Sequence, residues 1–368
     1  MATLSFGKRL IPAPLRPQAQ RLYHAGRLAV KARLDQTGAL LLEQVVFRYG
    51  FGQIAFFRLF SSAFLREERA VAAGRRAFAD DRRAAHKGSF LLRRNIHRIE
   101  KGLIADGPAR VFARDYILET VDELARFDQV SEPSAERIWA VDVLTAYFAA
   151  VPKSDSVVAQ AHEAFQAILR PETNGLSAPY LRALDEVVPS IEALQALAIR
   201  RRSVRHCLDK PVDRTLVDKA LDVARQAPSA CNRQAFSFRI FDSAQAAQSV
   251  ASLPMGTKSF LHNIQNVAVL VGHLRAYPYP RDRHAIYIDG GLAAMSFANG
   301  LEAQGLSSCM INWADQSGPD RAITKKLKLA ADDRVIMLIS FGWPDPTARV
   351  PFSAKRSLPQ IRSFHAEV

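Results

Sequence analysis

Residues 201–205 read Arg-Arg-Ser-Val-Arg. They lie where a helical pattern ends and a pattern of alternating helices and strands begins. Three guanidinium groups and a hydroxyl within five residues are suited to hold an anion, because a guanidinium is a planar fork of donors that matches phosphate oxygens two at a time. The alternative is a solvated cluster at a helix C-terminus, where positive charge complements the helix dipole. These five residues alone leave both interpretations open.

The chain that follows this turn alternates helices with strands. Apolar periodicity predicts helices over residues 213–227, 288–304 and 319–328, and strands over residues 236–241, 267–272, 309–311 and 335–341. On the first of these helices the pattern turns Leu216, Ala220, Val223 and Ala224 inward, and Gly305 is expected to end the second. This alternation predicts an α+β or α/β fold. No Gly-x-Gly-x-x-Gly follows a strand, so a Rossmann nicotinamide site is not expected.

The chain before the turn has a helical pattern throughout. It predicts helices over residues 66–105, 109–126, 134–151, 155–170 and 178–200. In the last of these, one stripe carries Leu181, Leu184, Val188, Ile191 and Leu194. We therefore predict two domains, an all-helical basic region over residues 1–190 and a second domain over residues 191–368.

The net charge of +14 is unevenly distributed: +13 in residues 1–105, −7 in residues 106–190 and +8 in residues 191–368. A basic first third indicates an acidic partner, which is a nucleic acid, an anionic membrane surface, a nucleotide-linked substrate or the acidic middle of the same chain. A merely solvated face is the other interpretation. No zinc finger, RNP-like strand or helix-turn-helix is recognisable, so we expect no specific nucleic-acid binding.

The cysteines and the apolar runs indicate in which cellular compartment the protein is expected. Three scattered cysteines exclude a disulfide framework or a zinc site of regular spacing, and no secretory signal is recognisable over residues 1–33. The most apolar stretch, residues 39–65, is interrupted by Arg48 and Arg58, so we expect no transmembrane helix. It packs against neighbouring helices or lies on a membrane surface. We expect a cytoplasmic protein, with peripheral membrane contact as the alternative.

Residues 91–103, LLRRNIHRIEKGL, form an amphipathic segment. At helical spacing one face carries Leu92, Ile96, Ile99 and Leu103, and the other carries Arg94, His97, Arg98 and Lys101. Glu100 neutralises part of the second face. This polar face is either a surface for a ligand or a seam of salt bridges between helices.

Five separated motifs together resemble the nitroreductase family of FMN flavoproteins. They are the turn at 201–205, the loop APSACNRQ at 227–234, the helix IDGGLAAMSFANGLEAQGLSS at 288–308, the strand end at 309–313 and Lys355-Arg356. The resemblance covers roughly residues 194–361 and implies an α+β fold with a central mixed sheet flanked by helices, in a homodimer with FMN at the interface. The motif RRNIHRIEKG at 93–102 is similar to that of a subgroup with a helical N-terminal extension.

The resemblance also implies roles for residues. Arg201 and Ser203 would hold the FMN phosphate together with Lys355 and Arg356, Arg202 would lie along the ribityl chain, and Arg205 would reach the N1/O2 edge of the ring. A cation at that edge stabilises the negative charge that develops when flavin accepts a hydride. The backbone N–H of Asn312, with Trp313 beside it, would face flavin N5. The partner subunit would cover the ring with a loop that contains Pro228, Ser229, Ala230, Asn232 and Gln234.

The sequence departs from the family pattern at several positions. Ala235-Phe236 replaces a usual Pro-Trp, Ser296 stands where the dimer helix commonly has Asn, and Asn312-Trp313 replaces Glu-Gly or Thr-Gly. An indole next to N5 would narrow the substrate pocket. The adjacent cations Lys355 and Arg356 leave open which of the two meets the phosphate.

These observations predict an FMN-dependent oxidoreductase with NAD(P)H as reductant. It would transfer a hydride by a ping-pong route to a small organic acceptor, which is anionic if the face at 94–101 binds it. The alternative is a flavin domain kept as a scaffold, acting as a binding or assembly protein at an anionic membrane or a polysaccharide-synthesis complex. No metal is expected, because the histidines have no ligand spacing. We interpret Cys231 and Cys309 as small buried groups and not as nucleophiles.

Overall fold

The computed structural model describes residues 64–83, 90–105, 111–130, 134–169, 177–183 and 187–365. The chain divides into two compact units, Met1–Arg66 and Glu67–Val368. Residues 1–63, which include nearly all of the apolar stretch 39–65 and part of the basic first third, lie outside the described residues. The boundary predicted between residues 190 and 191 stays a prediction.

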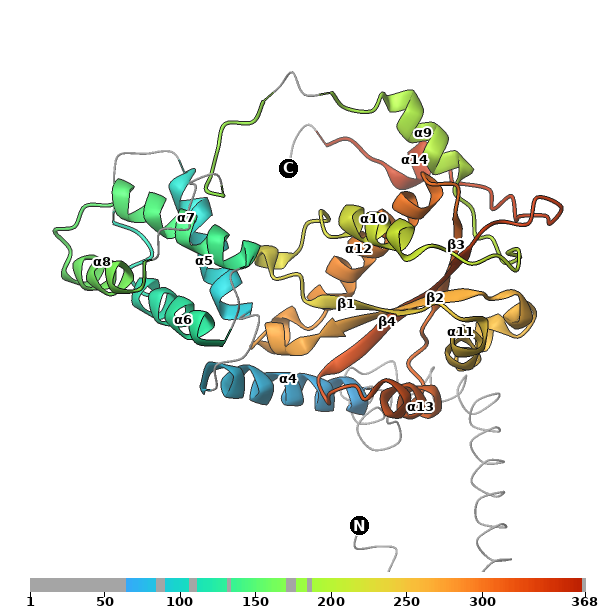
Figure 1. The fold of residues 1–368 in the computed structure, drawn as a ribbon, viewed down its shortest axis with the longest axis horizontal. Coiled ribbons are helices and arrows are strands. Elements are labelled where there is room, and N and C mark those ends of the chain that lie inside the picture. Colours follow the sequence, from blue (N-terminus) through green and yellow to red (C-terminus); the bar gives the residue numbers. More distant parts are fainter. Residues whose placement is uncertain are drawn as a thin grey trace, which may run out of the picture. The chain divides into compact units, whose positions relative to one another are not determined.

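A four-stranded sheet organises the second half of the chain. Its strands, in the order β1-β2-β4-β3, are β1 (Phe236–Phe241), β2 (Asn266–His273), β4 (Asp333–Gly342) and β3 (Ser307–Asn312) (Figure 1). All three pairs of neighbouring strands are antiparallel. The predicted mixed character is confined to one parallel bridge, between Ser203 and Ser308. The four predicted strands and the α+β class are confirmed.

Helices cover both faces of this sheet (Figure 1). Ala268 and Leu270 of β2 pack on the side of α10 (Arg214–Ala224) and α12 (Ala285–Glu302). Val267, Val269 and Val271 pack on the side of α11 (Ala244–Ala251) and α13 (Ser317–Leu327). Successive strand residues point to opposite faces, so burial of both faces accounts for the continuous apolar run of β2.

The two helices α10 and α12 approach each other closely. A Cβ on Gly300 would lie 2.9 Å from the Cα of Ala220, so only glycine fits at this crossing. Gly305 follows α12 with φ +82°, and the N–H of Leu306 donates to the carbonyl of Leu301 at 3.1 Å, which confirms the predicted end of the helix.

The inward face predicted for α10 is partly wrong. Ala220 and Ala224 are buried and Leu216 is half-buried, but Val223 is 47% exposed and Val217 is buried in its place. The physical reason is that the close contact at Gly300 centres the buried stripe on Ala220, which leaves Val223 at the margin of the helix interface.

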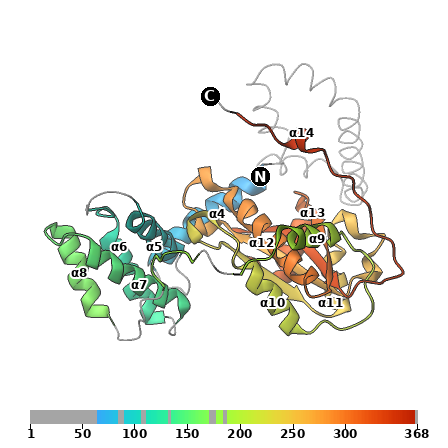
Figure 2. The same cartoon turned by 90° about the horizontal axis from the view of Figure 1, so that it is seen from above.

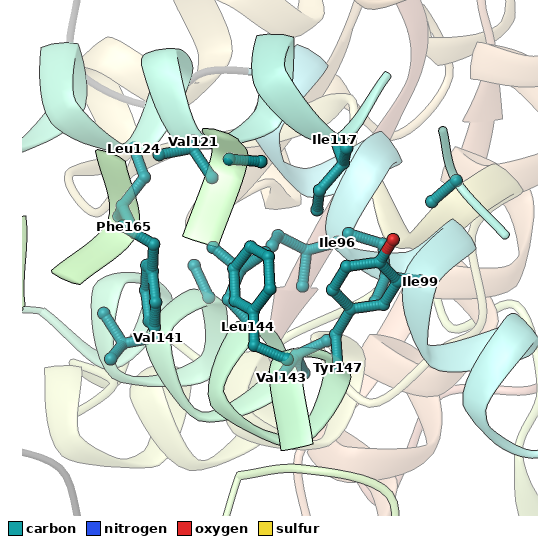
Figure 3. Close-up of a cluster of buried hydrophobic side chains, with 14 of the residues drawn as sticks. Ile96, Ile99, Ile117, Val121, Leu124, Val141, Val143, Leu144, Tyr147 and Phe165 are labelled. Carbon is teal, nitrogen blue, oxygen red and sulfur yellow. The ribbon is translucent and has the colours of Figure 1, made fainter. Parts of the chain in front are cut away.

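A separate core lies among four helices of the N-terminal half: α5 (Phe90–Leu103), α6 (Ile117–Val130), α7 (Ala135–Ala150) and α8 (Ser156–Ile168) (Figures 1 and 2). Ile96, Ile99 and Tyr147 point into this cluster (Figure 3). Burial raises the pKa of Tyr147 to about 12, and its hydroxyl donates to the carbonyl of Phe112 at 2.7 Å. The predicted apolar face of residues 91–103 is therefore the core face of α5.

Residues 66–105, predicted as one helix, contain two described helices, α4 (Leu65–Arg83) and α5, and the residues between them lie outside the described set. Ala70 of α4 packs with Leu274 and Tyr277, which follow β2. A Cβ on Gly74 would lie 2.8 Å from the carbonyl carbon of Leu274, so glycine permits this close packing. α4 is thereby fixed to the end of the central strand.

The helix predicted over residues 178–200 is wrong in its first half. Among the described residues of this range, which are 178–183 and 187–200, only α9 (Ile191–Arg200) is helical, and Leu181 is 98% exposed. Pro189 disfavours helical backbone at Val188, and Ser190 caps the helix by accepting from the N–H of Ala193 at 3.2 Å. α9 buries no side chain, and neither does α14 (Leu358–Ile361) in the C-terminal tail.

None of the described helices is both long and apolar enough to cross a bilayer.

Candidate functional site

The Arg-rich turn at 201–205 is fixed against the edge strand β3. After α9 ends, the chain runs beside β3, where the N–H of Val204 donates to the carbonyl of Ser308 at 3.0 Å. Arg200 donates from Nε to the buried carboxylate of Glu302 at 3.0 Å. The sequence analysis missed this pair, because nothing local relates residues that are 102 positions apart.

The guanidinium groups of this turn keep unused donors. The Nε of Arg201 is buried without a hydrogen-bond partner, Arg202 donates only to the carbonyl of Arg201 at 3.0 Å, and the guanidinium of Arg205 lies 5.6 Å from the ring centre of Phe260. Within the described part of the chain, no carboxylate forms an ion pair with any of these three arginines. A buried donor without a partner is costly, so the turn is suited to an anion.

Two cysteines lie near this turn, and both are protonated thiols at neutral pH. Burial raises the pKa of Cys309, against the opposing effects of the Arg205 charge and a hydrogen bond with Ser203. Burial raises the pKa of Cys207 to about 11. The thiolate is the nucleophilic form, so the geometry agrees with the interpretation of Cys309 as a small buried group.

The end of β3 presents Asn312 and buries Trp313. Asn312 is exposed, while Trp313 is 8% exposed and its indole Nε1 donates to Asp320 at 2.8 Å. The expectation that the indole narrows a pocket beside Asn312 is therefore wrong. The reason is the alternation of the strand, which turns consecutive side chains to opposite faces and sends the indole to a buried acceptor on α13.

The loop at 228–234 is held by its own side chains and by Asp289. The N–H of Ala230 donates to both carboxylate oxygens of Asp289 at 3.1 Å, and Tyr277 donates its hydroxyl to the same carboxylate at 2.7 Å. Ser229 accepts from the N–H of Gln234 at 3.0 Å, and Gln234 donates to the side chain of Asn232 at 3.0 Å. The sequence analysis gave Asp289 no role.

The backbone of this loop is unusual. Cys231, Asn232 and Gln234 have φ of +53°, +48° and +51°, a left-handed conformation that costs energy for residues other than glycine. Pro228 and Ala230 are exposed. Strained residues persist only where surrounding contacts over-determine them, and they gather at functional sites. The loop is thus a preformed surface element.

Helix α5 of the helical bundle contacts this loop. Arg93 donates from Nε to the carbonyl of Asn232 at 2.9 Å and pairs with Glu136 at 3.4 Å. His97 lies 3.3 Å from Glu100, which also accepts from the indole of Trp139 at 2.8 Å. The polar face of α5 is therefore in part the predicted seam between helices.

The predicted site residues fall into separate groups within one chain. β1 and β3 are the two edges of the sheet, and three strand spacings make them about 14 Å apart. The loop at 228–234 leads into β1, whereas the turn at 201–205 and Asn312 belong to β3. Lys355 and Arg356 are exposed in the tail, and no hydrogen bond or ion pair among the described residues joins them to the turn.

The described residues also show no metal centre. They contain no group of three or more His, Cys, Asp or Glu side chains that could hold a metal ion.

Comparison with known proteins relates the second half of the chain to one family. Residues 198–343 match the model of the nitroreductase family. Similar solved structures include an FMN-dependent nitroreductase from Clostridium difficile, with 21% identity, 46% of this chain and 98% of that chain covered, and a TM-score of 0.40. A nitroreductase family protein from Streptococcus pneumoniae has 20% identity, coverages of 47% and 100%, and a TM-score of 0.41. No curated protein matches the sequence.

Proposed function

Because residues 198–343 form a nitroreductase-family domain, as the motifs predict, we propose that the protein is an FMN-dependent oxidoreductase. It passes a hydride between NAD(P)H and a small organic acceptor by a ping-pong route. The observation that carries this proposal is the position of the family match, which spans the turn at 201–205, the loop at 228–234 and the end of β3.

The turn at 201–205 fits the FMN phosphate. The orphaned Nε of Arg201 is a buried donor that a phosphate oxygen would satisfy, and the hydroxyl of Ser203 lies beside it in sequence. Lys355 and Arg356 would complete the phosphate site from the tail, whose side chains are exposed and held by no described contact elsewhere. Positive charge gathered at this edge also favours a dianion.

The residues that follow along β3 would position the flavin ring. FMN supplies the hydride chemistry when it is bound, so no side-chain acid or base is needed. The backbone N–H of Asn312, at the exposed end of β3, would donate to the N5 side. Arg202 would lie along the ribityl chain. Arg205, exposed beside Phe260, would stabilise the negative charge at the N1/O2 edge.

A second copy of the chain would complete the site. The loop with Pro228, Ser229, Ala230, Asn232 and Gln234 leads into β1, and β1 and β3 are opposite edges of the sheet, about 14 Å apart. Ile288, Leu292 and Met295 form an exposed apolar stripe on α12 at helical spacing. A homodimer that buries this stripe would bring the partner's loop to the flavin.

The alternative, a scaffold at an anionic membrane or a polysaccharide-synthesis complex, has no support among the described residues. Of the basic residues 1–105 that motivate it, the structure describes 64–83 and 90–105. A cytoplasmic location stays a prediction.

The test is an absorption spectrum of the purified protein, followed anaerobically during addition of NADH or NADPH. We expect flavin absorption bands that bleach on addition of NADH or of NADPH. Mass spectrometry of the released cofactor should identify FMN. Arg201→Ala should weaken FMN binding, whereas Arg225→Ala, which removes an exposed i,i+3 pair with Asp222, should not. Protein that stays colourless after FMN is added would refute the proposal.

A further inference from the structure

Three arginines from two parts of the chain lie together where α5 contacts the loop at 228–234. Arg94 and Arg98 are on α5, and Arg233 is in the loop. Burial, followed by the like charges of Arg98 and Arg233, holds the pKa of the Arg94 guanidinium below its usual value. The geometry agrees, because Arg93 on the same helix donates to the carbonyl of Asn232, the residue before Arg233, at 2.9 Å.

The flanking residues hold two of these side chains in place without neutralising them. The guanidinium of Arg98 lies 3.8 Å from the ring centre of Tyr116, and that of Arg233 lies 4.8 Å from the ring centre of Tyr277. Stacking on an aromatic face fixes a guanidinium plane and leaves its edge donors available.

Arg233 has a donor that the chain leaves unused. It is 7% exposed, its NH1 donates to the carbonyl of Ala230 at 3.1 Å, and its Nε is buried without a hydrogen-bond partner. A charged group buried to this degree is ordinarily paired.

Three carboxylates near this cluster pair with other groups, and the charge of a fourth, Asp115, acts on Tyr116. Glu136 pairs with Arg93, Glu100 pairs with His97, and Asp289 accepts from Ala230 and Tyr277. Among the described residues, no carboxylate forms an ion pair with Arg94, Arg98 or Arg233. Within the described residues, these three like charges therefore have no counter-ion, and one of them is buried with a free donor.

We propose that Arg94, Arg98 and Arg233 form an oxyanion site that binds the carboxylate or phosphate of the acceptor reduced at the flavin. The link to the acceptor rests on the proposed function, which places the loop of Arg233 against the flavin of the partner subunit. Anion binding itself does not depend on that function. The helical bundle thus adds a charged recognition surface, through α5, to a domain whose own residues serve the cofactor.

The first experiment measures anion binding directly. Calorimetry on the full-length protein as purified uses inorganic phosphate and benzoate as probes, which distinguishes the two oxyanions. For Arg94→Gln and Arg98→Gln we expect at least about tenfold weaker binding of the preferred probe, since a charge-assisted hydrogen bond is lost. The matched control is Arg114→Gln, which removes an exposed pair with Asp155 on the same bundle. Unchanged affinity in both cluster variants, or no anion binding by the wild type, would overturn the site.

The second experiment links the site to turnover. Reduction of 4-nitrobenzoate is compared with that of the neutral 4-nitrobenzamide. The wild type should prefer the anion, and Arg94→Gln should lose that preference in kcat/KM, about tenfold, while the amide stays within about twofold. Arg94→Lys keeps the charge but not the planar fork, so it should restore part of the preference. An equal fall with both probes would mean a structural role for Arg94 and would contradict the proposal.

The two arms separate the two proposals. Protein that binds the anion but reduces neither probe contradicts the flavin function and leaves the anion site standing. Protein that reduces both probes equally well, with no anion preference, contradicts the anion site and leaves the flavin function standing.

Discussion

Asp289 is the carboxylate on which the conformation of the loop at 228–234 depends. It is buried, and it accepts from the backbone N–H of Ala230 and from the hydroxyl of Tyr277. Burial, followed by this hydrogen bond, raises the pKa of Tyr277 well above its usual value, so the phenol is a donor at neutral pH. Removing the charge should therefore loosen the loop.

We predict that Asp289→Asn lowers the free energy of unfolding by about 1–3 kcal/mol, because the buried donors of Ala230 and Tyr277 lose a charged acceptor. Tyr277→Phe removes one of the two donors. The double variant completes a double-mutant cycle with the wild type and the two single variants. Urea unfolding of all four proteins should give a coupling of about 0.5 kcal/mol or more between the two positions. Strictly additive losses would mean that the hydrogen bond at 2.7 Å contributes nothing to stability.

The residues of the site were predictable by type, but their partners were not. The turn at 201–205 and the loop at 227–234 stand out as short motifs, because their chemistry is local. Asp289 is 59 positions from Ala230, and Glu302 is 102 positions from Arg200. Such pairs are set by how α12 crosses the sheet, which no local pattern contains. The indole of Trp313 was misplaced for a different reason, because the change of face at the end of β3 turns it toward Asp320, seven positions further on in α13.

At the scale of elements, prediction succeeded where burial is complete. β2 and β4 read as continuous apolar runs because helices cover both of their faces. It failed for residues 178–190, where an apolar stripe suggested a helix, but the described residues 178–183 and 187–190 are not helical. Periodicity assumes that a stripe has something to pack against, and within the described chain this one has nothing.

The end of α13 allows a prediction about helix termination. Lys328 follows the helix with φ +52°, where a side chain costs energy that glycine avoids. Lys328→Gly should raise the free energy of unfolding by about 1 kcal/mol. Lys325→Gly, at an exposed position inside the same helix, should lower it by about the same amount. Chemical denaturation compares the two, and a fall for both variants would contradict the left-handed cap.

At the scale of the whole molecule, exposed apolar side chains lie on α12, which resembles the dimer helix of the nitroreductase family, and on α9 and the C-terminal tail. Ile288 and Leu292 on α12 are 63% and 44% exposed, and α9 and the tail bury no side chain of their own. Contiguous exposed apolar surface marks an interaction site in a protein of ordinary composition. The loop at 228–234 leads into β1, at the opposite edge of the sheet from β3, which agrees with the proposal that two copies of the chain share the site.

Dimerisation and FMN binding should therefore fail together. Leu292→Glu places a charge on the exposed stripe of α12, so we predict a monomer in analytical ultracentrifugation that has also lost most of its FMN. Ile104→Glu, at an exposed apolar position on the helical bundle, is the matched control and should leave a yellow dimer. Circular dichroism checks that both variants are folded. A folded Leu292→Glu monomer that keeps FMN at wild-type affinity would show that one chain suffices for the cofactor, and the loop of the second copy would then have no part in holding it.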